Sequence, residues 1–182
     1  MEYTNERINK ESEAESLGYF IEAYESIIDE SFISIESSER PDFTATRRDG
    51  SQIGIELSKI RRGHPNDILY DKIIEKKDYM SVYDALGMIQ RVAYAKEIKR
   101  NSSGWALPNT TILLLELTDI PLSELRYSIL PDILPDLYET GFAEIWLVDL
   151  TGVEAYGNVE LFCVYPKEFE GYYPRGIQKP YG

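Results

Sequence analysis

A short turn between two strand-like stretches is the strongest local constraint on how this chain folds. The stretches are Pro41–Thr44 and Ile53–Lys59, and the dipeptide Asp49-Gly50 lies between them. An Asp-Gly turn flanked by strand-forming residues is a typical hairpin sequence. The sequence therefore predicts an antiparallel β-hairpin with a carboxylate on each strand, Asp42 and Glu56.

The length of the hairpin loop decides whether these two carboxylates lie on the same face of the sheet, because side chains alternate along a strand. A two-residue loop would place Phe43 opposite Glu56 and turn Asp42 to the other face. A three-residue loop would instead pair Thr44 with Glu56. Asp42 would then lie opposite Ser58, and both carboxylates would share a face. Only a loop of odd length, or a bulge, supports a joint site.

Pro41-Asp42 followed by the triplet Glu56-Leu57-Ser58 resembles the motif of the PD-(D/E)xK nuclease superfamily. The resemblance covers roughly residues 10 to 165. It implies a single α/β domain whose mixed central β-sheet is flanked by helices, as in the restriction-endonuclease-like fold. It also implies Mg²⁺-dependent, or Mn²⁺-dependent, hydrolysis of phosphodiester bonds, most often in DNA. Asp42 and Glu56 would hold the metal, which suits the preference of Mg²⁺ for carboxylate oxygens.

The sequence departs from this motif at its lysine, because Ser58 stands where the family has one. Lys59 follows the lysine position of the motif by one residue, so in a regular strand it faces away from the side of the sheet that carries Glu56. Only a bulge would turn it toward that side. A lysine of the following helix is the other route, as in some members of the superfamily. Between residues 85 and 100, Lys96 and Lys99 fall on the apolar helical stripe. The alternative is that both side chains extend along the end of the stripe into solvent.

An acid from the first helix often completes the site in this superfamily. The chain predicts a helix from about Asn9 to Asp29, and Glu13 projects onto its apolar face, close to Leu17 and Phe20. Glu13 is therefore the first candidate for a third metal ligand, with Glu22 as the second. The alternative is that Glu13 lies in a fraying first turn and meets only water and the helix dipole.

Charge is the strongest argument against a nuclease, because a formal net charge of −13 repels a polyanion. The charge is uneven: residues 1–46 carry 3 basic and 12 acidic side chains, whereas residues 47–100 carry 12 basic and 8 acidic ones. Arginines close to the hairpin are candidates for contacts with a phosphate backbone, unless they are simply solvated loop charges. They are Arg47, Arg48, Arg61 and Arg62. The rival hypothesis is a nuclease-like scaffold without catalysis that binds a protein partner through its acidic surface, as an immunity or regulatory protein would.

The rest of the chain predicts one domain of 182 residues. Further strands are expected at Phe32–Glu36, Thr111–Leu117, Ala143–Leu150 and Val159–Tyr165, a helix is expected to reach Arg100, and the tail from about Glu170 to the end is expected to be irregular. One cysteine and one histidine are too few for a zinc site. No apolar run of 18 residues is present, so we expect no membrane span and a cytoplasmic protein.

Overall fold

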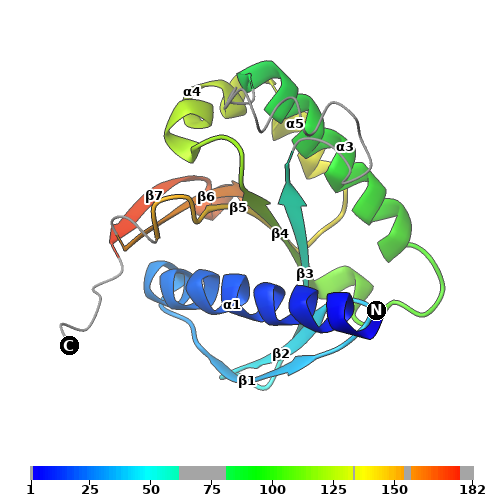
Figure 1. Ribbon diagram of the computed structural model, residues 1–182. Helices are drawn as coiled ribbons and strands as arrows, with labels where there is room; N and C mark the ends of the chain where they lie inside the picture. The colour runs from blue at the N-terminus through cyan, green and yellow to red at the C-terminus, as the bar shows by residue number, and fades with distance from the viewer. Residues whose placement is uncertain (1, 62–80, 133, 154–156, 177–182) are drawn as a thin grey trace.

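The computed structural model describes residues 2–61, 81–132, 134–153 and 157–176. Within these ranges, seven strands form one sheet whose spatial order follows the chain, from β1 at one edge to β7 at the other (Figure 1). The strands are β1 (Phe32–Ser37), β2 (Phe43–Arg47), β3 (Gln52–Ile60), β4 (Thr111–Leu117), β5 (Glu144–Asp149), β6 (Asn158–Tyr165) and β7 (Gly171–Gly176).

The sheet is mixed, with parallel strands at its centre and antiparallel strands at both edges. β3, β4 and β5 are parallel, whereas β1–β2–β3 and β5–β6–β7 are antiparallel. Parallel neighbours need a crossover connection, and here these connections carry helices. The helices are α1 (Glu2–Ile28), α3 (Val82–Arg100), α4 (Leu122–Asp132) and α5 (Leu134–Tyr138), with short 3₁₀ turns η1 (Pro108–Thr110) and η2 (Lys167–Phe169).

Helices cover both faces of the sheet and divide the core into two layers (Figure 1). One layer lies between the sheet and α1 and includes Phe20, Tyr24, Ile55, Leu114 and Trp146. The other lies between the sheet and the helices α3, α4 and α5, and includes Ile60, Ile89, Leu113, Leu125 and Leu147. The central strands alternate between the two layers, as expected for strands that are buried on both faces.

Helix α3 begins and ends with local capping interactions. The Ser81 side chain accepts a hydrogen bond from the Asp84 backbone N–H, which satisfies a donor of the first turn. Lys99 and Arg100 lie in the last turn, where positive charge favours the helix dipole. The buried Arg100 side chain donates to the carbonyl oxygens of Pro108 and Thr140, at 2.7 and 2.9 Å. α3 is therefore fixed at both ends, which sets the position of its inward-facing side chains.

The fold class predicted from the sequence is confirmed: a single α/β domain with a mixed central sheet flanked by helices. The prediction of an irregular tail is wrong for Gly171–Gly176, which pair with β6 as an added edge strand, and its remaining part, residues 177–182, lies outside the described residues. The local sequence does not predict this strand, because Pro174 and two glycines have low strand propensity. An edge position in a sheet tolerates such residues. No helix within the described ranges is long and apolar enough to cross a membrane.

Candidate functional site

The hairpin of β2 and β3 brings Asp42 and Glu56 together. Its pairs include Phe43 with Ile55 and Thr44 with Gly54, so neither predicted pairing is the observed one. The loop has three residues, 48–50, and is closed by a 2.9 Å hydrogen bond from Arg47 N–H to the Ser51 carbonyl. Because the loop has an odd number of residues, Asp42 and Glu56 still lie on the same face of the sheet, as predicted for an odd loop. Extending the observed register by one residue places Asp42 directly opposite Glu56.

Side-chain hydrogen bonds replace the backbone ladder where β2 begins. The backbone N–H of Asp42 donates to Oε2 of Glu56 at 3.2 Å. The backbone N–H of Leu57 in turn donates to Oδ2 of Asp42 at 2.8 Å. Each carboxylate therefore holds the strand that carries the other, and both side chains are fixed side by side.

Lys96 on α3 points at this carboxylate pair. Its ammonium group forms an ion pair with Oε1 of Glu56 and donates to the Leu57 carbonyl oxygen at 3.2 Å. The Lys96 side chain is 17% exposed and that of Glu56 only 5%. A buried charge needs such a partner, which explains why a lysine lies on the core-facing side of the helix.

Glu13 on α1 lies within electrostatic range of the pair. Burial raises the pKa of the Glu13 carboxyl above its usual value, and the negative charge of Asp42 raises it further. Lys96 and Lys59 oppose this shift. Burial also raises the pKa of Glu56, which Lys96 lowers and Asp42 raises again. The site is thus a cluster of carboxylates and ammonium groups whose protonation states depend on one another.

The other two candidate lysines do not contact the pair. Lys59 faces α1, as its position in a regular strand predicts, where it donates to the Ser12 hydroxyl at 2.9 Å and lies 3.8 Å from Oε1 of Glu116. Lys99 is exposed in the last turn of α3. The second first-helix candidate, Glu22, is exposed and lines a separate groove beside β1.

The four arginines near the hairpin differ in their surroundings. Arg47 is largely engaged within the protein, because its guanidinium contacts Glu144 at 2.6 Å and Glu30 at 3.3 Å. Arg48, in the hairpin loop, and Arg61, after β3, are exposed. Arg62 lies outside the described residues, as does His64. Of the described arginines, Arg48 and Arg61 present their charge to solvent, where a phosphate backbone could reach it.

Sequence reasoning missed Glu116 on β4. This side chain is 7% exposed, and its Oε2 has no hydrogen-bond partner in the described part of the protein. Glu116 pairs with Lys59 in the parallel register of β3 and β4. A charged residue within the otherwise apolar strand Thr111–Leu117 was the signal that could have revealed it, because such residues are rarely buried without a partner.

The carboxylate pair has the donor chemistry of a Mg²⁺ site. Mg²⁺ is usually bound through one or two carboxylates, with waters and substrate phosphates as its other ligands. An ionised carboxylate has about four lone-pair sites, so Asp42 and Glu56 keep acceptor capacity beyond their present bonds. Across the described ranges, no three His, Cys, Asp or Glu side chains gather closely enough to hold a metal ion. The fit is therefore that of a two-carboxylate site with Glu13 at longer range.

Comparisons with protein-family models, curated proteins and solved structures give no match to this chain.

Proposed function

We propose that the protein hydrolyses phosphodiester bonds, most readily those of DNA, with Mg²⁺ or Mn²⁺ held by Asp42 and Glu56. One observation carries this proposal: Lys96 reaches from α3 to the carboxylate of Glu56, which also accepts a hydrogen bond from the backbone of Asp42 just before the adjacent strand. This geometry supplies an ammonium group where the sequence motif lacks its lysine. The proposal includes the restriction-endonuclease-like classification of the fold, which the hairpin and the mixed sheet support.

Each residue of the cluster has a distinct role in this mechanism. A bound Mg²⁺ would supply Lewis-acid polarisation of a phosphoryl oxygen. Asp42 and Glu56 would hold the cation. Glu13 would orient the water molecules bound to the cation through a hydrogen bond. Lys96, held by the Leu57 carbonyl, would donate a hydrogen bond to the phosphate as negative charge develops there. Arg48 and Arg61 would guide the nucleic-acid backbone toward the site.

The decisive experiment measures cleavage of single-stranded and double-stranded DNA with Mg²⁺ and with Mn²⁺. Lys96→Met should lower the rate by about 10² to 10³-fold, since it removes a charge-stabilising donor. Lys99→Met is the matched control, because it removes the same charge one turn along α3 from an exposed position and should leave the rate unchanged. Asp42→Asn and Glu56→Gln should both abolish cleavage.

Metal binding gives a second readout that does not depend on the choice of substrate. A cation at 100 times its dissociation constant stabilises the folded state by about 2.7 kcal/mol. The melting temperature of the wild type should therefore rise with Mn²⁺, and that of Asp42→Asn should not. A wild type that neither cleaves nucleic acid nor gains stability from either metal would overturn the proposal.

The second candidate is a catalytically inactive scaffold that binds a protein partner. The net charge of −13 favours it, because that charge opposes association with a polyanion. This candidate predicts the result that overturns the first: no cleavage and no stabilisation by divalent metal.

A further inference from the structure

The edge strand β1 (Phe32–Ser37) has two features that protect a sheet edge, the charged Glu36 and a register irregularity near Phe32, but it has neither lysine nor proline. In the described part of the chain it pairs on one side only, with β2. Proteins commonly shield such edges with lysine or proline, but the sequence of β1 is Phe-Ile-Ser-Ile-Glu-Ser. Ile33 is 66% exposed and Ile35 39%. Apart from the irregular register between Phe32 and Ser34, the strand is regular and can accept another strand along its outer side.

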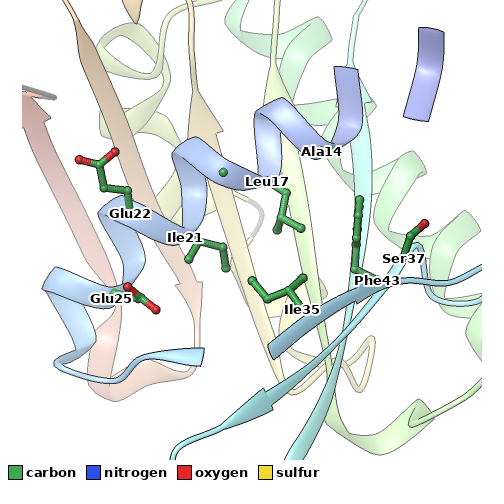
Figure 2. Close-up of a pocket in the computed structure, with 9 residues that line it drawn as sticks. Ala14, Leu17, Ile21, Glu22, Glu25, Ile35, Ser37 and Phe43 are labelled. Atoms are coloured by element: carbon green, nitrogen blue, oxygen red, sulfur yellow. The ribbon is translucent and has the colours of Figure 1, made fainter. Parts of the chain in front are cut away.

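A groove of about 480 Å³ opens beside this edge, between β1 and α1 (Figure 2). Leu17 and Ile21 of α1 and Ile35 of β1 point toward one another across it, with Phe43 of β2 nearby. A strand added to β1 would alternate its side chains between the two faces of the sheet. Those on the α1 face would enter this apolar groove.

Two acidic side chains of α1 line the groove, and a third acidic residue lies on β1 with its side chain on the opposite face of the sheet from Ile35. These residues are Glu22 and Glu25 of α1 and Glu36 of β1. Glu25 also accepts a 3.0 Å hydrogen bond from the Phe32 backbone N–H, which fixes the start of the edge strand against α1. Residues 1–46, which include both walls of the groove, hold 3 basic and 12 acidic side chains. A second copy of the chain would bring the same negative charge to this edge, so charge selects a basic partner.

We infer that β1 and its groove bind an extended, basic segment of a partner protein by strand addition. The segment forms backbone hydrogen bonds with β1, places apolar side chains against Ile21 and Ile35, and sets lysine or arginine beside Glu22 and Glu25. Main-chain pairing gives the affinity and the groove gives the selectivity, as in other strand-addition complexes. This surface is distinct from the carboxylate cluster, and its occupation requires no catalysis.

The test uses a labelled peptide, Lys-Thr-Ile-Thr-Lys-Thr-Ile-Thr, that places lysine and isoleucine on one strand face. Fluorescence anisotropy should show saturable binding to the full-length protein. Two control peptides should each bind at least about tenfold more weakly, a loss of about 1.4 kcal/mol. One has glutamate in place of lysine, and the other has proline in place of the threonine at the fourth position. Hydrogen exchange should show new protection of the β1 amides in the complex.

Two variants locate the site, and a third controls for net charge. Ile35→Lys and Glu22→Lys should each weaken binding of the basic peptide at least about tenfold. Glu139→Lys, an exposed position after α5, makes the same change of charge as Glu22→Lys away from the groove and should leave affinity unchanged. Circular dichroism and melting temperature verify that each variant folds.

Three outcomes of the peptide experiment would overturn the inference. They are no binding at millimolar peptide, equal binding of the lysine and glutamate peptides, and unchanged affinity in Ile35→Lys. A concentration-dependent dimer that Ile35→Lys abolishes would also contradict it, because the occupant of the edge would then be a second copy of the chain.

Discussion

At the scale of single residues, the Glu13 carboxyl gives the cluster a measurable pH dependence. Its pKa is raised above 4.5 by burial and by Asp42, so the folded state binds this proton more tightly than the unfolded state. Stability is then lost as pH rises from about 4.5 through the folded pKa, and the loss persists above it. Glu13→Gln should remove this loss.

The measurement is the melting temperature of Glu13→Gln and the wild type between pH 3.5 and 7.5. The two proteins should melt alike at the acid end, and the variant should become the more stable as pH rises. A difference that does not change with pH would show that the raised pKa contributes nothing to stability. Mn²⁺ should narrow the gap at neutral pH, because a cation favours the ionised carboxylates of the wild type.

At the scale of elements, Gly54 allows the chain before β2 to lie against β3. A Cβ at this position would lie 2.6 Å from Cγ of Pro41 and 2.9 Å from Oγ1 of Thr111. Gly54→Ala should therefore displace Pro41 and, with it, Asp42. We expect loss of metal-dependent stabilisation and a destabilisation of about 1 to 3 kcal/mol, typical of overpacking.

Gly18→Ala is the control for this change. It makes the same substitution in the middle of α1, where a Cβ would meet nothing within 4 Å. Helix propensity alone predicts that it stabilises the protein by about 0.5 to 1 kcal/mol. Chemical denaturation with and without Mn²⁺ checks both variants, and a Gly54→Ala protein with wild-type metal response would contradict the packing argument.

The contacts of Lys59 connect three elements: β3, β4 through Glu116, and α1 through Ser12. Lys59→Met should destabilise the fold by about 1 to 3 kcal/mol, because it leaves the buried Glu116 carboxylate without its counter-charge. Adding Glu116→Gln should recover part of this loss. A double-mutant cycle by urea denaturation measures the coupling, and additive effects would show that the 3.8 Å pair is not energetically linked.

At the scale of the whole molecule, a buried polar network connects β2, α1 and β5. Arg47 donates to Tyr24 at 3.0 Å and to Glu144 at 2.6 Å, and Trp146 donates to the other oxygen of Glu144 at 2.8 Å. Because Glu144 is buried, its charge depends on Arg47 for compensation. The network therefore links distant parts of the α1 face of the sheet.

Arg47→Met should cost about 3 kcal/mol of stability, since removing one partner of a buried ion pair leaves the other uncompensated. Arg48→Ala, on the next residue and exposed, should change stability by less than about 0.5 kcal/mol. If the protein binds DNA, Arg48→Ala should instead reduce the dependence of affinity on salt. Equal stability of the two variants would contradict the structural role of Arg47.

Local sequence patterns determined most of the elements of this protein. Thr111–Leu117 is a strand with the predicted bounds, and β6 (Asn158–Tyr165) lies within one residue of the strand expected at Val159–Tyr165. Both follow from short-range periodicity. The placement of Asp42 and Glu56 on one face of the sheet also follows from local sequence, because any hairpin loop with an odd number of residues produces it.

Tertiary structure decided which charged groups meet. The sequence left Lys59, Lys96 and Lys99 open, and only the packing of α3 against the sheet brings Lys96 to Glu56. β7 likewise exists through its hydrogen bonds to β6, against its own composition. These outcomes depend on contacts between residues far apart in the chain, whose relative positions local propensity does not encode.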